Sequence, residues 1–214
     1  MSSFESTAGA ALIKEVAAVI VVNKAYLSEI DGKIGDGDHG INMAKGFARA
    51  ADQLGGGETF DQALQILSDV LVNEIGGSMG PLYGLMFADM ADVAEGLDTI
   101  DLAAFSRILR AGLEGVSEVG SAKVGDKTML DTLVPAVTFL EQAVQAGTDF
   151  ALALREMKAR AIKGRDSTVD MVAKVGRSSR LGERSRGVLD AGATSCCLIL
   201  ETLSDGITQR LTTP

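Results

Sequence analysis

The stretch "IGDGDHGINMAKGF", residues 34–47, holds four glycines, two aspartates and the only histidine of the chain. A polar, glycine-rich stretch of this kind separates two regular elements. Apolar residues at helical spacing precede it, from Leu12 to Leu27, until "SEIDGK" ends the pattern. A second helix is expected from near Gly40 to the glycine cluster at 55–57. The stretch therefore predicts two helices that meet at an acidic junction.

The rest of the chain repeats this arrangement of apolar helices between glycine-marked loops. A third helix is expected from Phe60 to the loop "GGSMG", and no segment alternates like a strand. Pro135 lies inside the sixth helix and Gly164 is a candidate break in the seventh. Further helical patterns cover residues 80–94, 101–116, 127–146, 149–174 and 190–210. The sequence predicts an all-α fold of about eight antiparallel helices, an up-and-down bundle or barrel with its site at one end.

The composition narrows the classes of partner. With 20 Lys and Arg against 29 Asp and Glu, the net charge of −9 opposes general binding to nucleic acid or to anionic membranes. No leader or membrane-spanning pattern is found, so we expect a cytoplasmic protein without nucleic-acid or membrane partners. Cys196 and Cys197 are adjacent in an apolar run and are expected to be buried, reduced thiols.

Two familiar glycine motifs do not fit the acidic junction. Gly35, Gly37 and Gly40 satisfy the dinucleotide-binding pattern G-x-G-x-x-G, but that pattern needs a preceding buried strand, and here a helix precedes. A calcium-binding EF-hand loop that begins at Asp36 would place Phe47 where a bidentate glutamate is required. The sequence context excludes both interpretations.

Three carboxylates remain on this short loop, those of Asp31, Asp36 and Asp38. Hard divalent cations such as Mg²⁺ bind carboxylate oxygens and leave other positions for water or phosphate oxygens. The glycines let the backbone approach a phosphate closely, and the amides at the start of the next helix favour an anion. A solvated acidic turn with helix-capping aspartates is the alternative for any isolated stretch of this kind.

Three further glycine-rich stretches also lead into helices: "GGSMGPLYG" (76–84), "GSAKVGDKTMLDTL" (120–133) and "GRSSRLGERSRGVLDAGATS" (176–195). The second offers Lys123 and Lys127 as cations and Met129 as a soft apolar surface for a base. The third carries arginines, whose planar forks suit phosphate: Arg177, Arg180, Arg184 and Arg186. If the four stretches meet at one end of the bundle, they form a site for a metal and an anion.

Together the four stretches resemble the nucleotide-binding L subunits of dihydroxyacetone kinases, which are similar to the C-terminal domain of single-chain, ATP-dependent dihydroxyacetone kinases. The signatures follow the order of the family: "IGDGDHGINMAKGF", "GGSMGPLYG", "GDKTMLD" and "GRSSRLGERSRG" with "DAGATS". They span most of the chain. The resemblance implies one nucleotide-binding kinase domain over residues 1–214, an eight-helix barrel that holds ADP or ATP and two Mg²⁺ ions at one end.

The resemblance also implies roles for individual residues. The metal ligands would be Asp31, Asp36 and Asp38, and these aspartates together with Arg177 would serve catalysis. The nucleotide would contact His39, Gly40, Ile41, Asn42, Ser78, Met79, Gly120, Met129, Arg177, Asp190, Ala191 and Gly192. In the family a histidine of a separate K subunit holds the ketose covalently, so His39 is not expected to be that nucleophile.

The implied activity is phosphoryl transfer from a Mg-nucleotide to a short ketose held by the K subunit, with dihydroxyacetone as the default substrate. In one version bound ADP is rephosphorylated by a phosphocarrier, the M subunit of a phosphotransferase system; in the other, ATP exchanges at each turnover. A kinase of another ketose such as erythrulose and a non-catalytic, nucleotide-dependent regulatory partner are alternatives. The sequence leaves the ketose and the oligomeric state open, with a homodimer among the options.

Two positions depart from the family pattern. Serine is usual where this chain has Met79, so a hydroxyl that would bind phosphate is missing and the backbone amide remains. Proline is common at the position of Ala191, which is a milder change. The first departure bears on how tightly the nucleotide is retained.

Overall fold

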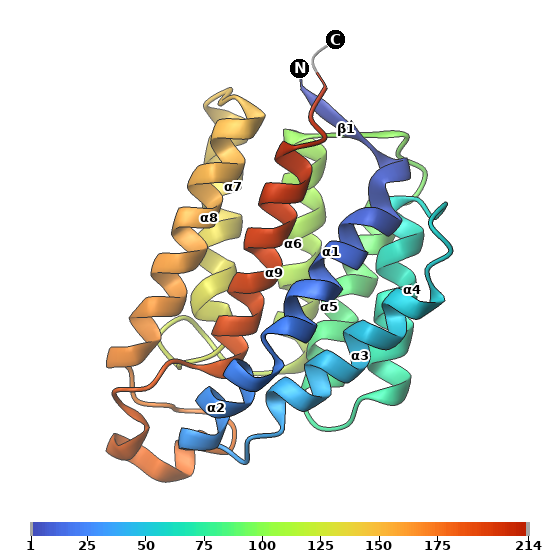
Figure 1. Ribbon diagram of the computed structural model, residues 1–214. Helices are drawn as coiled ribbons and strands as arrows, with labels where there is room; N and C mark the ends of the chain where they lie inside the picture. Colours follow the sequence, from blue (N-terminus) through green and yellow to red (C-terminus); the bar gives the residue numbers. More distant parts are fainter. Residues whose placement is uncertain (1, 213–214) are drawn as a thin grey trace.

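A computed structural model describes residues 2–212, which form nine α-helices, three short 3-10 helices and one two-stranded sheet (Figure 1). The α-helices are α1 (Gly9–Val22), α2 (Lys24–Ile34), α3 (His39–Gln53), α4 (Phe60–Glu74), α5 (Met79–Ala94), α6 (Leu102–Val119), α7 (Leu130–Gln145), α8 (Phe150–Ser167) and α9 (Ala191–Thr208). The 3-10 helices are η1 (Ser6–Ala8), η2 (Thr168–Asp170) and η3 (Ser178–Ser185), and the strands are β1 (Ser3–Glu5) and β2 (Thr99–Asp101). The predicted all-α class is confirmed.

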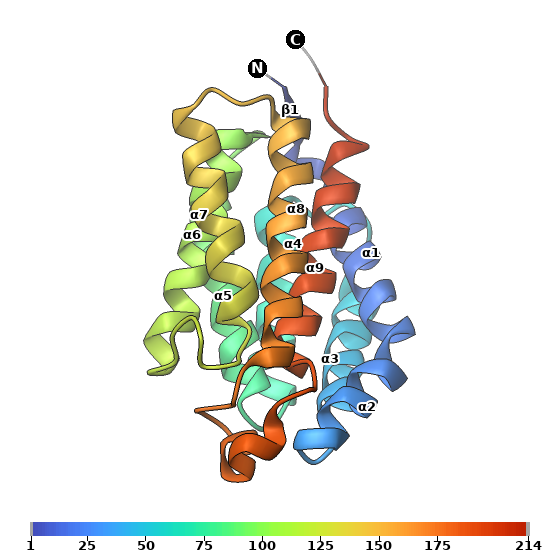
Figure 2. The ribbon, with the colours of Figure 1, turned by 90° about the vertical axis from the view of Figure 1, so that its left-hand side faces the viewer.

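The long helices close into a ring around an apolar core. Contacts run in order from α4 through α5, α6, α7, α8 and α9 to α1, which returns to α4. Figure 2 shows α8 between α7 and α9. Helix α3 packs on α1, α2 and α4. The predicted up-and-down bundle is therefore present as a helical barrel.

Acidic side chains fix the beginnings of three helices. Asp101, Asp149 and Asp190 each accept a hydrogen bond from the backbone N–H of the third residue that follows, in α6, α8 and α9 respectively. Such caps satisfy amides that have no partner inside the helix and typically contribute about 1 kcal/mol each. The starts of these helices are thus encoded locally.

The first predicted helix is present as two helices, α1 and α2, which is why the structure has nine α-helices instead of eight. The break lies at Asn23, whose side-chain amide donates to the carbonyl of Val19 at 2.8 Å and so competes with the helical backbone. Helix α2 then continues through "SEIDGK" to Ile34, so the expectation that this stretch ends the helix is wrong. Asp31 consequently lies in the last turn of α2 and not on the loop.

Two short strands also depart from the prediction that the chain has none. β1 pairs with β2 antiparallel, with Phe4 opposite Ile100, and the Phe4 ring meets Phe60 edge to face at 5.6 Å. Ser3 forms a further bridge to Thr212. Figure 1 shows this sheet at the end of the barrel opposite α2 and the start of α3. Three-residue strands are too short to produce an alternating sequence pattern.

Two positions that the sequence marks as irregular lie inside continuous helices. α7 continues through Pro135, and α8 continues through Gly164, so Gly164 does not break its helix. A Cβ atom at Gly164 would meet the backbone carbonyl of Asp131 and lie 3.0 Å from the Cα atom of Thr132. The glycine is therefore required by the close approach of α7.

Gly164→Ala is expected to lower the free energy of unfolding by about 1–3 kcal/mol, because the methyl group overpacks the contact with the α7 backbone. The matched control is Gly32→Ala in α2, where the nearest atom to a new Cβ is 3.8 Å away. There the helix propensity of alanine should stabilise the protein by about 1 kcal/mol. Urea unfolding measures both, and an equal gain in the two variants would contradict the packing argument.

Candidate metal and nucleotide site

A cavity of about 550 Å³ opens at the end of the barrel formed by α2 and the starts of α3, α5, α7 and α9. All four glycine-rich stretches contribute to its lining. Of the residues that the resemblance implies, the lining includes Asp31, Asp36, Asp38, His39, Ser78, Met79, Gly120, Met129, Arg177, Asp190, Ala191 and Gly192. The expectation that the site lies at one end of the bundle agrees with this arrangement.

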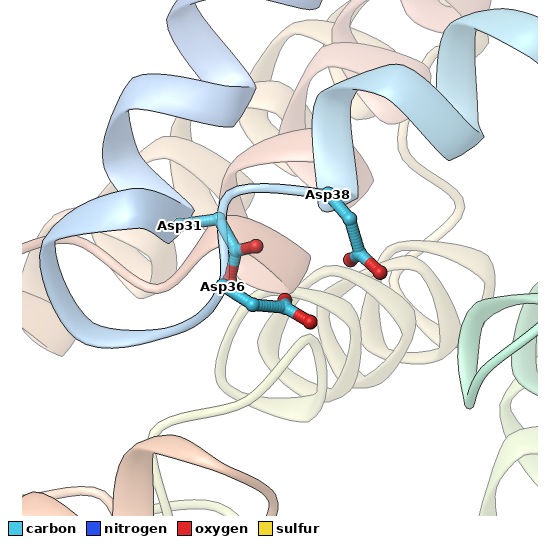
Figure 3. A group of neighbouring side chains, drawn as sticks. All are labelled: Asp31, Asp36 and Asp38. Atoms are coloured by element: carbon cyan, nitrogen blue, oxygen red, sulfur yellow. The ribbon is translucent and has the colours of Figure 1, made fainter.

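Asp31, Asp36 and Asp38 bring their carboxylates together at the mouth of this cavity. One oxygen from each lies within 4.8 Å of the others, and Figure 3 shows the three groups around one space between the end of α2 and the start of α3. Three negative charges this close repel one another unless cations lie between or beside them. Arg177 supplies one cation, because it forms an ion pair with Asp36. The carboxylate set and spacing fit a hard divalent cation such as Mg²⁺.

Gly40, Ile41 and Asn42 do not line the cavity. A Cβ at Gly40 would meet the carbonyl of Lys24 and lie 2.7 Å from the backbone nitrogen of Ser28, so this glycine lets α3 begin directly against α2. The side chain of Ile41 points to solvent and is 51% exposed. These residues shape the junction that holds Asp38 and His39 at the cavity.

His39 lies at the inner wall of the cavity in a buried hydrogen-bond network. Its Nε2 atom is 2.8 Å from Oγ of Ser195, which is 2.7 Å from the hydroxyl of Tyr83. That hydroxyl also donates to the carbonyl of Gly192 at 3.1 Å. Burial lowers the pKa of His39 to about 4, although Asp31 partly offsets the effect. His39 is therefore neutral at pH 7 and joins α3, α5 and α9 below the site.

Asp190 combines a capping role with a position at the cavity. Its carboxylate accepts from the backbone of Ala193 at 2.7 Å, and its own N–H donates to Oγ1 of Thr168 at 3.0 Å. Burial raises the pKa of Asp190 to about 7, which the hydrogen bond from Ala193 and the charge of Lys127 partly oppose. A bound cation would favour the ionised form.

The two lysines that the sequence offers as cations lie in different surroundings. Lys127 is 1% exposed and donates from Nζ to three backbone carbonyls, and Lys123 is exposed and does not belong to the cavity lining. Backbone carbonyls thus bind the ammonium of Lys127, which belongs to the cavity lining, and solvent surrounds Lys123. Among the residues that line the cavity, Arg177 is left as the exposed cation.

Apolar side chains form another part of the cavity lining. The lining includes Leu82 from α5, Val116 and Val119 from α6, and Met129 before α7. An apolar surface with a soft thioether suits the flat face of an aromatic base. The sequence identified Met129, whereas the residues of α5 and α6 show only an ordinary helical pattern.

No helix within residues 2–212 combines the length and the apolar character that crossing a bilayer requires.

Comparisons with known proteins agree with the fold and with the motifs. The family described as the DAK2 domain matches residues 33–205. The chain is 36% identical over 181 residues to the ADP-binding subunit of the PEP-dependent dihydroxyacetone kinase of Escherichia coli, covering 84% of this chain and 86% of that one. It is 32% identical over 203 residues to the L-erythrulose kinase of Pectobacterium atrosepticum, covering 91% of this chain and 34% of that one.

The helical barrel is also similar to a solved structure. The dihydroxyacetone kinase of C. freundii, in complex with AMP-PNP and Mg²⁺, superposes with a TM-score of 0.68 at 23% sequence identity. The match covers 92% of this chain and 33% of that one. At this identity the similarity supports the fold, and the site rests on the residues described above.

The buried imidazole of His39 predicts a loss of stability in mild acid. The folded-state pKa, about 4, lies below the ordinary value of 6.5, so the contribution of His39 is complete above pH 6.5 and is lost as the pH falls toward 4. Between pH 7 and pH 5 the loss is about 2 kcal/mol. His39→Gln, which keeps a hydrogen-bonding group near Ser195 but does not titrate, should lack this part of the pH dependence.

Urea unfolding of both proteins without added metal or nucleotide, at pH 7 and pH 5, measures the difference. The same pH dependence in the variant and the wild type would show that His39 is not buried in its neutral form.

Proposed function

The chain belongs to the DAK2-domain family, and from this premise we propose that it is the ADP- or ATP-binding, phosphoryl-transferring subunit of a kinase for short ketoses. The single observation that carries the proposal is the convergence of Asp31, Asp36 and Asp38 at a cavity that the other three glycine-rich stretches complete. The protein is thus an enzyme subunit, a phosphotransferase of the dihydroxyacetone kinase type. Residues 1–214 act in it as one nucleotide-binding domain.

The three aspartates would hold Mg²⁺, and we propose two ions, the number that the resemblance to dihydroxyacetone kinases implies. When bound, the metal neutralises phosphate oxygens and holds the polyphosphate in position. The carboxylates themselves fix where the charged end of the nucleotide lies, between the end of α2 and the start of α3. His39, neutral and buried, keeps the start of α3 in place through Ser195 and Tyr83.

The chain's other residues orient the nucleotide and offset charge. The apolar wall with Met129 and Val116 receives the base, and the backbone at Ser78, Met79 and Gly120 lines the path toward the phosphates. Gly40, Ile41 and Asn42 support this site from outside the cavity. Arg177, exposed and paired with Asp36, is free to turn its guanidinium to the transferring phosphoryl group.

Phosphoryl transfer depends mainly on positioning and on neutralising charge, and no side chain of this chain needs to act as the nucleophile. The acceptor is a hydroxyl of dihydroxyacetone presented by a separate ketose-binding K subunit. The E. coli relative that matches most of this chain is named PEP-dependent and ADP-binding. We therefore favour a retained ADP that is rephosphorylated by the phosphocarrier M subunit, which places the protein in the cytoplasm with its nucleotides and carriers.

Two alternatives follow from the comparisons and the sequence. The similarity to the erythrulose kinase, at 32% identity, supports an ATP-exchanging subunit of a related ketose kinase. A non-catalytic, nucleotide-dependent regulatory partner would keep the cavity without needing the full aspartate set. Dialysis distinguishes the two kinase versions, because a retained ADP stays with the protein and ATP alone then supports no turnover.

Asp36→Asn tests the function directly. In a mixture with the K subunit, the phosphorylated carrier, Mg²⁺ and dihydroxyacetone, the variant should form ketose phosphate more than about 100-fold more slowly, since even indirect partners of a metal ligand contribute about 10–100-fold. Asp52→Asn, at an exposed aspartate of α3, is the matched control and should be unchanged. Undiminished transfer by Asp36→Asn would rule out the metal role of the three aspartates.

Met79→Ser tests the departure from the family pattern. A hydroxyl at the start of α5 can donate to a phosphate oxygen, which is worth about 1 kcal/mol or about fivefold in affinity. Met79 is 8% exposed, so losing its side chain also costs stability, and Met79→Ala is the control that loses the same apolar group without gaining a hydroxyl. Calorimetric titration with Mg-ADP should give tighter binding for the serine variant than for the alanine variant. Equal affinities would show that the hydroxyl does not contribute to nucleotide binding.

A further inference from the structure

Arg177 lies on a long irregular segment that leaves the barrel and returns to it. The Arg177 segment, residues 171–188, follows η2 and ends just before the capping residue Asp190. It contains η3, which Figures 1 and 2 show beside α2 at the site end of the barrel. Glycines 176, 182 and 187 have positive φ angles. Such a segment needs anchors at its base if Arg177 is to meet Asp36 reproducibly.

The two ends of the segment are joined where it leaves and re-enters the barrel. Gly187 donates its N–H to the carbonyl of Val169 at 2.7 Å, and Asp190 donates to Oγ1 of Thr168 at 3.0 Å. Arg186 also donates to the carbonyl of Asp170. Hydrogen bonds to the η2 turn therefore hold the end of the segment close to its start.

Lys127 contacts both ends of the Arg177 segment and the η2 turn before it. Its Nζ atom donates to the carbonyl oxygens of Thr168 at 2.6 Å, Met171 at 3.2 Å and Val188 at 2.5 Å. These use all three N–H donors of the ammonium group, and the side chain is 1% exposed. Buried charges are stable only when they are fully hydrogen-bonded, and these carbonyl dipoles supply that environment.

Lys127 has a backbone conformation that favours glycine, so its side chain must have a role at this position. Lys127 has a φ of 64°, and within residues 2–212 it is the one non-glycine residue with a positive φ. That conformation costs a lysine roughly 1 kcal/mol, whereas glycine adopts it freely. A glycine would therefore be favoured here if the position were only a turn of the loop.

We propose that Lys127 is a positioning residue, an internal cation that closes the base of the Arg177 segment and so sets Arg177 and Asp190 at the cavity. The proposal rests on the proposed function for its consequence in nucleotide binding, but the clamp itself is a property of this chain alone. Lys127 belongs to the cavity lining, and in this role it acts through the segment that its ammonium holds.

Lys127→Gly tests the clamp, because it removes the ammonium while relieving the backbone. Hydrogen exchange of the metal-free protein, followed by mass spectrometry, should show amides of residues 168–190 exchanging at least about tenfold faster, with α4 and α5 unchanged. The affinity for Mg-ADP should fall at least about tenfold. Lys163→Met, which removes a charge from an exposed position of α8, is the matched control and should behave like the wild type.

Rescue by amines separates the ammonium from other effects of the substitution. Butylammonium has the atoms that the glycine variant lacks and should slow exchange of residues 168–190 again, whereas tetramethylammonium, with no N–H donor, should not. Lys127→Gln retains two N–H donors and should lie between the wild type and the glycine variant.

Unchanged exchange in the glycine variant, or an equal response to the two cations, would overturn the proposal. Faster amide exchange throughout α1 to α6 in both Lys127→Gly and Lys127→Gln would also overturn it, because the substitutions would then destabilise the whole fold. If the wild type itself binds no Mg-ADP, the proposed function fails, while the exchange measurements still decide whether Lys127 holds the segment.

Discussion

The repulsion among Asp31, Asp36 and Asp38 is the constraint on which the rest of the structure depends. Carboxylate oxygens within 4.8 Å of one another repel, and the sequence around them is glycine-rich and acidic. Arg177, from a distant part of the chain, forms an ion pair with Asp36, and the adjacent cavity has room for a metal ion. Holding these groups at one end requires α2, α3, α9 and the Arg177 segment to meet there, which is what the closed ring of helices achieves.

Much of the fold follows from local sequence. Apolar spacing and glycine boundaries predict each long helix, and capping aspartates such as Asp149 and Asp190 mark where helices begin. The division into α1 and α2 does not follow, because the apolar pattern runs on through Asn23 and only the bond from its amide to Val19 interrupts the backbone. The same continuity places Asp31 inside a helix. Strands of three residues leave no periodic signal at all.

The candidate site is predicted in outline, since the four glycine-rich stretches that the sequence singles out all line the cavity. Partners formed by backbone atoms are not predictable in this way. Lys127 looks like a phosphate-binding lysine, yet the backbone carbonyls of Thr168 and Val188 bind its ammonium, and any residue type can supply a carbonyl. Tyr83 and Ser195 lie within the quoted stretches, but their contact with each other depends on how α5 and α9 are placed across the barrel.

The bridge between Ser3 and Thr212 holds both residues at one end of the barrel, where another polypeptide could be attached. Both residues lie at the end of the molecule away from Asp31, Asp36 and Asp38 (Figure 1). A second polypeptide joined near either residue would extend from the sheet end of the barrel and leave the mouth of the cavity unobstructed. Immobilisation through that end would likewise orient every molecule with Asp31, Asp36 and Asp38 toward the solution.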